Sequence, residues 1–383
     1  MNLIYNSPNR GHHFKYAEAF YNRGMLKNFI SGFSRFSPRA DWGVLKEKTI
    51  HADLVQNFYL ASLKFNFPKL ISDEISYLSK CFIDYKSSKR LENTDVFLHY
   101  SGAGLYSYKN ANKYNVLKIV EAVNSHVEIQ ESILKDEYSK CNIEWKPFYE
   151  KEKKRRVEEY LQADYILTPS SFVKQSFIDK GFEPNKILKA PFGFEQFNSN
   201  NLLIENKKDE FVILYVGSIS IRKGLRYLIE AINNLKHRHL KVKVVGPMTQ
   251  ITGLNSMYIS DQIEFVGVLK GDALKEAYMS SDLFCLPTLE EGLALVLGEA
   301  LSFGLPIITT VNSGAQELIT DEVEGFILPI QDSKAISDKI QLLMDDKSRY
   351  WLMRNAAISK SKKLNGWDSA TNHMTKIISN LIT

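Results

Sequence analysis

The sequence predicts an α/β protein with two domains, each built on a largely parallel sheet. Length is the first reason, because 383 residues exceed what one ordinary hydrophobic core encloses and would form two domains of about 190 residues. The second reason is that short strand-like runs alternate with amphipathic helical stretches along both halves of the chain. A composition of 44% hydrophobic and 24% charged residues is ordinary for a globular protein and excludes a low-complexity chain.

In the first half, four apolar runs are predicted to be strands, and residues 41–93 between them are predicted to be an irregular insertion that covers the sheet. Helical patterning inside this insertion spans residues 54–65 and 71–85. Glycine or serine follows the first two strands closely, as a binding site at the carboxyl ends of parallel strands requires. The predicted strands are residues 2–5, 95–99, 116–122 and 164–168.

A polar, turn-prone stretch over residues 195–208 predicts the domain boundary, so the first domain is expected to span residues 1–200. A second α/β domain is expected over residues 201–360, with an amphipathic helix over residues 225–235 after its first strand. The helical, basic residues 361–383 are predicted to pack back onto the first domain. The strands predicted for the second domain are residues 211–217, 242–246, 263–267, 283–286, 306–309 and 325–328.

The charge of the chain is concentrated in the first half. Residues 1–200 carry 29 Lys and Arg against 23 Asp and Glu, a net +6, and the rest carry 20 against 21, a net −1, which together give +5. The densest basic cluster, residues 151–156, is interleaved with glutamates and is interpreted as a solvated helical face. Attraction to an anionic membrane surface or to a lipid-phosphate acceptor is the alternative. No recognition motif for nucleic acid accompanies the charge, so that partner is not expected.

The three cysteines predict a reduced, cytoplasmic protein. Cys81, Cys141 and Cys285 form no CxxC pair and leave an odd count, so neither a disulfide framework nor a zinc site is expected. The longest apolar runs are far shorter than the ~20 residues that a membrane helix requires. Residues 1–5 are interpreted as the start of a strand and not as a signal peptide.

Two glutamates eight positions apart, Glu291 and Glu299, mark the most informative segment for function. The segment follows a predicted strand, so a helix is expected to begin near Gly292. Along such a helix eight residues turn about 80° net and rise about 12 Å, which places both carboxylates toward one side. Unpaired N–H groups at a helix start attract phosphate, and Gly292 lets a ligand approach the backbone. This pattern suits a sugar nucleotide.

A second group of residues places positive charge at the same edge of the predicted sheet. The first strand of the second domain ends at Gly217, and the loop that begins with Ser218 ends in Arg222 and Lys223. Both cations precede an amphipathic helix and are well placed to neutralise a diphosphate leaving group. The alternative is that they only begin a surface helix.

These segments together resemble the family 4 glycosyltransferases of the GT-B fold, whose signature is the Glu-x7-Glu spacing. The resemblance implies two Rossmann-like α/β/α domains that face a central cleft, the first binding the acceptor and the second binding the nucleotide sugar. It also implies retaining transfer of a sugar from a nucleotide diphosphate, without a bound metal. The segments that carry it are residues 163–173, 190–197, 216–224, 291–299, 304–308 and 314–317.

By this resemblance Glu299 hydrogen-bonds the ribose hydroxyls and Glu291 contacts the transferred sugar. Many relatives carry arginine where this chain has Ser218, so the positive charge on the pyrophosphate rests on Arg222 and Lys223. Loop backbone is expected to contact the base and the phosphates. The remaining predicted donor contacts are Gly11, Gly217, Gly246, Val268, Gly292, Leu293, Ala294 and Leu295.

Histidines are the candidates near the reacting carbon. His126 follows a predicted strand at the position where similar family members place a histidine beside the donor sugar, and it is predicted to be catalytic. His99 is its rival for this role. His12 and His13 follow the first strand, where they either meet the acceptor or belong to the structure of the loop.

The sequence therefore predicts a metal-independent retaining glycosyltransferase that uses a UDP- or GDP-linked sugar and no further cofactor. A glycan or lipid-linked acceptor is expected, in cell-envelope polysaccharide or glycolipid synthesis, with peripheral contact at the inner face of the membrane. A sugar-nucleotide epimerase or hydrolase of the same fold, or a non-catalytic sugar-nucleotide binder, is the alternative. A nicotinamide dehydrogenase is disfavoured, because residues 102–107 lack the third glycine of GxGxxG.

Overall fold

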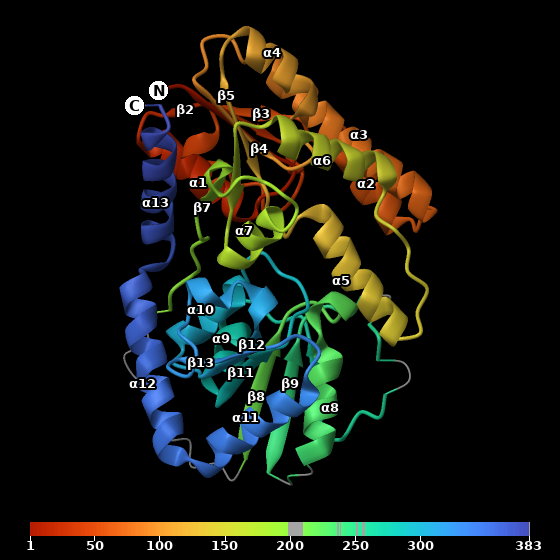
Figure 1. Ribbon diagram of the computed structural model, residues 1–383, viewed down its shortest axis with the longest axis vertical. Coiled ribbons are helices and arrows are strands. Elements are labelled where there is room, and N and C mark those ends of the chain that lie inside the picture. Colours follow the sequence, from red (N-terminus) through yellow and green to blue (C-terminus); the bar gives the residue numbers. More distant parts are fainter. Residues whose placement is uncertain (198–209, 236, 238, 250–251, 255–256, 383) are drawn as a thin grey trace.

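The computed structural model contains two parallel sheets, one in each half of the chain, with helices packed around both (Figure 1). The first sheet has seven strands in the order β3-β2-β1-β4-β5-β6-β7, and the second has six in the order β10-β9-β8-β11-β12-β13. The predicted architecture of two α/β domains with parallel sheets is therefore confirmed. The structure describes residues 1–197, 210–235, 237, 239–249, 252–254 and 257–382, so the predicted boundary after residue 200 lies outside the described residues.

The first sheet is built around strands that are buried on both faces. Along β1, Leu3 and Tyr5 pack with the helix α1 on one face, whereas Ile4 packs with the core around α3 on the other. Such strands appear in a sequence as continuous apolar runs, which is why β1, β4, β5 and β6 were predictable. The strands are β1 (Leu3–Ser7), β2 (Leu26–Ser31), β3 (Thr49–His51), β4 (Val96–Tyr100), β5 (Leu117–Glu121), β6 (Tyr165–Thr168) and β7 (Ile187–Lys189).

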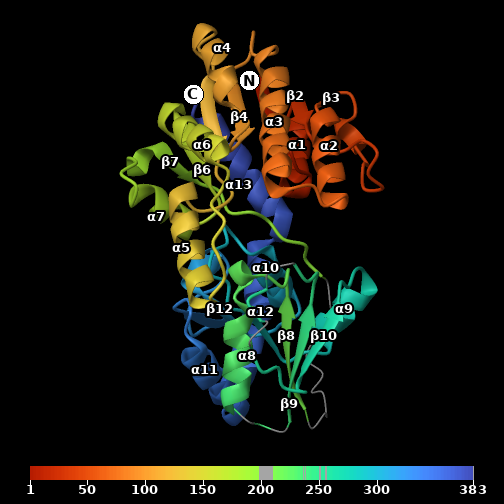
Figure 2. The ribbon, with the colours of Figure 1, turned by 90° about the vertical axis from the view of Figure 1, so that its right-hand side faces the viewer.

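Residues 41–93 are not the irregular insertion that the sequence predicted. They contain the edge strand β3, which pairs with β2, and two helices packed against each other, α2 (Leu54–Lys64) and α3 (Lys69–Ser88) (Figure 2). The helical patterning within the segment was therefore informative, whereas the three-residue β3 was too short to give a pattern. The remaining helices of the first domain are α1 (Gly11–Asn22), α4 (Tyr108–Lys113), α5 (Val127–Lys140), α6 (Glu150–Gln162) and α7 (Ser171–Ile178).

The second sheet contains all six predicted strands, with ends shifted by at most two residues. Its central strands β8 and β11 are almost wholly buried, and α8 presents one apolar face to the sheet. The strands are β8 (Phe211–Val216), β9 (Leu240–Val245), β10 (Ile263–Gly267), β11 (Leu283–Leu286), β12 (Ile307–Thr310) and β13 (Gly325–Leu328). The helices are α8 (Leu225–Leu235), α9 (Asp272–Met279), α10 (Leu295–Ser302) and α11 (Ser333–Asp345).

The last two helices run from the second domain to the first (Figure 1). Helix α12 (Lys347–Leu364) packs on α10, and α13 (Gly366–Asn380) packs on α1. The chain turns between them at Asn365, which has the left-handed φ of 52° that asparagine tolerates better than most residues. Trp367 anchors α13, because its ring meets Tyr16 edge to face at 6.2 Å and its backbone lies where a side chain on Gly193 would be.

Three histidines of the first domain are enclosed by protein atoms. His99 on β4 stacks on Phe97, and burial lowers its pKa to about 4. His126 lies before α5, where its Nδ1 accepts a hydrogen bond from Glu128 N–H (3.3 Å), and burial lowers its pKa to about 4. Burial, with His13 adding to it, also lowers the pKa of His12 to about 4. All three are therefore neutral at pH 7.

We expect the stability of the protein to fall as pH drops from 6.5 toward 5. The unfolded chain binds protons with a histidine pKa of 6.5, whereas the folded chain does not protonate these rings until about pH 4. The loss should be on the order of 1 kcal/mol per histidine for each pH unit within that window. Urea denaturation at pH 7.0, 6.0 and 5.0 measures it. His99→Gln should reduce the dependence of the free energy of unfolding on pH by about a third. An equal pH dependence in the variant and the native chain would contradict an origin in the buried histidines.

Candidate functional site

The residues predicted to bind a donor come together at one edge of the second sheet. Arg222 and Lys223 form a short 3-10 turn after β8, and Glu291 lies in the loop after β11. Gly217 and Gly246 directly follow β8 and β9, and a Cβ on Gly246 would stand 1.9 Å from the carbonyl oxygen of Gly217. Because carboxyl ends of parallel strands share an edge, these separate sequence segments become neighbours.

Glu291 pairs with both predicted cations. Its Oε2 lies 3.3 Å from Arg222 Nη1 and forms an ion pair with Lys223 Nζ. Burial alone would raise the pKa of this carboxyl, but Lys223 and Arg222 outweigh it and hold the pKa below its ordinary value. Glu291 is therefore ionised at neutral pH. It can accept hydrogen bonds from sugar hydroxyls, but it cannot serve as a general acid.

Glu299 differs from Glu291 in that a tyrosine hydroxyl, and no described cation, is its partner. It is on α10, where Tyr278 Oη donates a hydrogen bond to its Oε2 (2.9 Å). Burial raises the pKa of Glu299 above its ordinary value, Tyr278 opposes that shift, and Glu195 adds to it. No ion pair within 4.0 Å is formed by Glu299 among the described residues, so its carboxylate can accept further hydrogen bonds.

The predicted helix start near Gly292 is wrong. Helix α10 begins at Leu295, so Glu291 and Glu299 do not share one helix, and the 80° geometry does not apply. The preceding residues are held away from helical conformation by the loop after β12. Glu291 N–H donates to the carbonyl of Asn312 (2.9 Å), and Ala294 N–H donates to that of Ser313 (3.1 Å). The N–H of Ala294 is therefore already used.

The space beside Gly292 is filled by backbone of the first domain. A Cβ on Gly292 would stand 1.8 Å from the carbonyl oxygen of Val123, and Ser170 Oγ donates a hydrogen bond to the Gly292 carbonyl (2.5 Å). The absence of a side chain therefore lets first-domain backbone approach, where the sequence suggested a ligand. Leu293 is buried beside it.

Glu290 is a residue of the site that the sequence did not single out. Its side chain is fully buried, and first-domain groups bind both of its oxygens. Ser125 donates to Oε1 from its N–H (3.0 Å) and its Oγ (2.9 Å), and Gln130 Nε2 donates to Oε2 (2.8 Å). Arg222 Nη1 lies 3.5 Å from the same Oε2. Glu290 thus joins the two domains and holds one of the predicted cations.

Two further acids fasten the domains together. Glu317 accepts hydrogen bonds from Ser171 N–H (2.8 Å) and Oγ (2.7 Å), and it pairs with Lys189 at 2.8 Å. On the opposite side, Glu137 of α5 accepts a hydrogen bond from Tyr227 Oη (2.6 Å). The two domains are therefore in direct polar contact around the predicted site.

The other predicted contacts are less enclosed. Gly11 begins α1 with φ of 30° and is exposed, and Val268 is exposed just after β10. Tyr215 Oη donates to the carbonyl of Ser218 (3.0 Å), which fixes that loop. Leu295 begins α10 and is half-buried. Direct contact of these residues with a donor stays a prediction.

His126 lies in a structural setting. Besides beginning α5, its ring packs against Tyr160, Phe177 and Phe182 at centroid distances of 5.3, 5.2 and 5.9 Å. Only 2% of the residue is exposed. The catalytic role predicted for His126 stays a prediction, and this packing favours the structural alternative.

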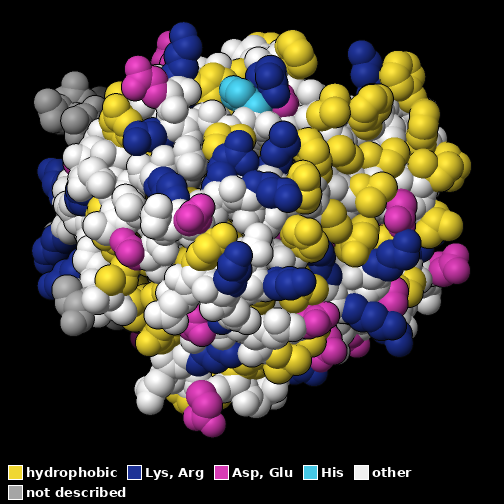
Figure 3. Space-filling view, turned by 90° about the horizontal axis from the view of Figure 1, so that it is seen from above, with side chains coloured by type: hydrophobic (Ala, Val, Ile, Leu, Met, Phe, Trp, Pro, Cys, Tyr) yellow, Lys and Arg dark blue, Asp and Glu magenta, His cyan; other side chains and the backbone are white. Residues whose placement is uncertain are grey.

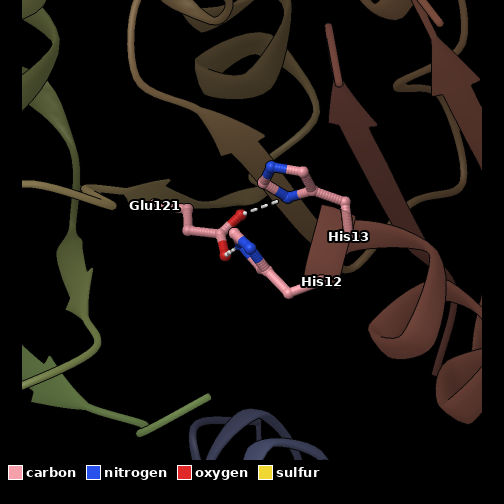
Figure 4. A group of neighbouring side chains, drawn as sticks. All are labelled: His12, His13 and Glu121. Carbon is pink, nitrogen blue, oxygen red and sulfur yellow. Dashed lines mark hydrogen bonds and ion pairs between the residues drawn. The ribbon is translucent and has the colours of Figure 1, made fainter. Parts of the chain in front are cut away.

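A buried cluster at the carboxyl ends of β1 and β5 was only partly visible in the sequence (Figure 4). Glu121 at the end of β5 binds His12 Nε2 through Oε1 (2.8 Å) and His13 Nδ1 through Oε2 (3.1 Å). Tyr5 Oη donates to the same Oε2 (2.7 Å). His12 also stacks on Phe192 at 3.9 Å. The sequence pointed to both histidines, but Glu121 is about 110 residues away and only the sheet brings it near them.

Burial alone would raise the pKa of Glu121, but His13 and His12 outweigh it and hold the pKa far below the ordinary range. Within the described residues, these three side chains are the one group of metal-ligating residues whose ligand atoms lie within 4.8 Å of one another. The hydrogen bonds inside the cluster already use the atoms that would bind an ion. The cluster is thus a satisfied polar set that fixes the loop after β1.

Comparisons with known proteins relate the chain to glycosyltransferases. Residues 200–363 match the model of the family described as glycosyl transferases group 1. The chain is 27% identical to sulfoquinovosyl transferase SQD2 of Arabidopsis thaliana over 222 residues, which cover 55% of this chain and 43% of that protein. It is 30% identical to the capsular polysaccharide biosynthesis glycosyltransferase CapM of Staphylococcus aureus over 203 residues, which cover 49% of this chain and 53% of CapM. The chain spans about half the length of the curated relatives it matches.

A solved structure extends the likeness to the whole chain. Anabaena HepE in complex with UDP-glucose superposes with a TM-score of 0.67 over 99% of this chain and 100% of that one, at 13% identity. At this identity the likeness shows the fold alone. Residues 200–363 are therefore similar to the glycosyl transferases group 1 family, and the chain as a whole has the GT-B fold.

We expect Glu290→Ala to loosen the two domains. The change leaves the Ser125 and Gln130 donors and part of Arg222 without an acceptor, which should cost about 2 to 4 kcal/mol. Chemical denaturation measures the loss, and small-angle scattering should show a larger radius of gyration. Glu322→Ala, which removes an exposed carboxylate, is the matched control. An unchanged radius and stability in Glu290→Ala would contradict the bridging role.

Proposed function

We propose that this protein is a retaining glycosyltransferase that moves a sugar from a nucleotide diphosphate to a glycan or lipid-linked acceptor. The observation that carries the proposal is the pair Arg222 and Lys223, held by Glu291 at the carboxyl edge of the second sheet. The family match of residues 200–363 supports it. The name of CapM, a capsular polysaccharide biosynthesis glycosyltransferase, supports a role in cell-envelope polysaccharide synthesis. The proposal extends to glycolipid synthesis and to the cytoplasmic side of the membrane.

A UDP- or GDP-linked donor suits the charges of this edge. Arg222 and Lys223 provide positive charge for the diphosphate, and ionised Glu291 accepts hydrogen bonds from the transferred sugar. Glu299, bound in the described residues by Tyr278, accepts from the ribose hydroxyls. The solved structure of HepE with UDP-glucose, which has the same fold, supports a nucleotide sugar as the donor.

The chemistry that fits these residues is substitution on one face of the anomeric carbon. Glu291 is an ion-paired acid with a lowered pKa, so it stabilises charge and does not deliver a proton. The departing diphosphate is stabilised by Arg222 and Lys223, and its own oxygen takes the proton of the acceptor hydroxyl. These two cations supply the neutralising charge, so the proposed reaction uses no metal.

Contact between the domains protects the reaction. Hydrolysis of the donor competes with transfer wherever water reaches the anomeric carbon. The contacts of Glu290 and Glu317 with the first domain hold the domains together around the site, and they must open for the donor and product to exchange. Consumption of the donor at equal rates with and without an acceptor would favour the hydrolase or epimerase alternative.

We expect Glu299→Ala to weaken binding of UDP or GDP. Loss of one charged acceptor for the ribose hydroxyls should raise Kd about tenfold or more. Isothermal titration with both nucleotides measures this and reveals the preferred base. Glu276→Ala on the neighbouring helix α9 is the control, because no ion pair holds that carboxylate in the described structure. Equal affinity in Glu299→Ala and in the native chain would remove Glu299 from the site.

We expect Lys223→Ala to lower kcat by about 10²-fold or more, because it removes a charge that acts on the leaving diphosphate. The free energy of unfolding should fall much less, since Glu291 keeps Arg222 as its ion-pair partner. Transfer assays with cell-envelope lipids and a thermal melt measure the two effects. Lys241→Ala, on an exposed ion pair of β9, should change neither. A variant with normal turnover would contradict the assignment.

A further inference from the structure

The two helices α2 and α3 pack together through small polar side chains. Ser62 Oγ donates to Ser72 Oγ (3.0 Å) across the helix contact, and Ser79 Oγ donates to Gln56 Oε1 (2.6 Å). Ser62 is the one buried residue of α2. Helix pairs in water bury an apolar stripe between them, whereas small residues and interhelical hydrogen bonds are typical of helix contacts in lipid. This helical pair is therefore built with its polar residues inside.

The apolar side chains of the same pair point outward. Phe65 and Leu70, on the loop and at the start of α3, are 68% and 70% exposed. Figure 3 shows hydrophobic side chains gathered on the side of the molecule where Figure 1 draws α2 and α3. We call these residues the hairpin surface. Its large exposed hydrophobic members are Leu54, Phe58, Leu60, Leu63, Phe65, Phe67, Leu70 and Ile71.

The hairpin surface continues along α3, and its tip carries two lysines. Ile71, Leu78 and Tyr85 are all exposed and lie seven residues apart, so they follow one face of the helix. Lys64 and Lys69 stand at the tip, and residues 54–72 contain no Asp or Glu. Lys69 pairs with Asp73 of α3 at 2.7 Å, whereas Lys64 forms no ion pair with a described residue. Large aliphatic and aromatic side chains bordered by lysine match the boundary between headgroups and acyl chains of an anionic bilayer.

We propose that the hairpin surface docks on an anionic membrane by inserting its tip into the interfacial layer. Among the described residues no helix is long and apolar enough to span a bilayer, so the hairpin rests in the interface. Helix α2 has 11 residues and is about 16 Å long, which suits shallow insertion. Protein partners and a second copy of the chain are the alternative occupants. The exposed Lys64 at the tip, which no described acid pairs with, and the polar contact between the helices favour lipid with anionic headgroups over both.

The basic cluster at residues 151–156 is not the membrane element. Lys153 of this cluster pairs with Glu131 and Glu150, both at 3.0 Å. Arg155 is buried and pairs with Asp84. These charges are therefore paired within the protein, and the buried Arg155 departs from the solvated face that the sequence predicted. The hairpin surface, in contrast, keeps its apolar side chains and Lys64 exposed.

The hairpin also borders a cavity that leads to the candidate site. The cavity has a volume of about 420 Å³, and its lining includes Lys69 and Asp73 of α3, Tyr149, Arg156 and Arg222. A docked hairpin therefore places the mouth of this cavity beside the lipid headgroups. This part rests on the proposed function: the acceptor that enters from the membrane side is lipid-linked, and its head group reaches Arg222 through the cavity.

Vesicle flotation of the full chain tests the docking. The native protein should bind vesicles of phosphatidylglycerol and phosphatidylcholine and should bind pure phosphatidylcholine at least tenfold more weakly. The triple variant Phe65→Ser, Phe67→Ser, Leu70→Gln should lose about tenfold or more in partitioning to the anionic vesicles. The double variant Leu161→Gln, Leu352→Gln removes side chains that are 64% and 71% exposed elsewhere and should bind like the native chain.

Native-like melting and nucleotide affinity in the triple variant will show that it folds. Absence of native binding to anionic vesicles, or equal binding by the triple variant, would overturn the proposal. A dimer in light scattering that the triple variant abolishes would assign the hairpin surface to a second copy and would also overturn it. Vesicle binding needs neither donor nor acceptor, so it can succeed while the proposed transferase function fails. If membrane docking and the transferase function are both correct, the triple variant should lose turnover on a vesicle-borne acceptor and keep its turnover on a short-chain soluble acceptor.

Discussion

The arrangement of the site depends on two adjacent carboxylates at the junction of the domains, the buried Glu290 and the partly buried Glu291. A buried carboxylate is tolerable only when cations or hydrogen-bond donors surround it. Glu291 takes Lys223 and Arg222 from its own domain, whereas Glu290 takes Ser125 and further donors from the other. One dipeptide therefore both orders the cations and joins the domains, so the geometry of the candidate site and the contact between domains are coupled.

Backbone contacts reinforce this coupling. Gly292 follows the two acids, and its missing side chain is what lets Val123 of the first domain come close. Ser170 then binds the carbonyl of the same glycine. On the first domain, the Glu121 cluster fixes the loop after β1 with a second buried and fully satisfied carboxylate. Both domains thus use buried acids at strand ends to order the loops that face each other, as electrostatic preorganisation requires.

The helices α2 and α3 of the first domain reverse the usual placement of polar and apolar side chains. Between α2 and α3 serines are inside and phenylalanines outside, which is unfavourable in water unless another phase covers them. A membrane on this side would lie at the mouth of the cavity that is lined by both Lys69 and Arg222. The positively charged first half of the chain is consistent with this orientation, although its densest basic cluster is occupied by internal ion pairs.

The sequence by itself determined the fold class, the central strands and the family resemblance, because buried parallel strands and loop motifs are local patterns. The sequence also predicted that Arg222, Lys223 and Glu291 lie at the carboxyl edge of the second sheet, because the carboxyl ends of parallel strands share one edge. Only the tertiary structure decided that Glu290 bridges the domains, since its partner Ser125 lies 165 residues away. Likewise, α10 begins late because the Asn312 loop takes N–H groups before it, and His126 is enclosed by rings from α6 and α7. Periodicity records which residues are buried, whereas what each buried group contacts is set by residues distant in sequence.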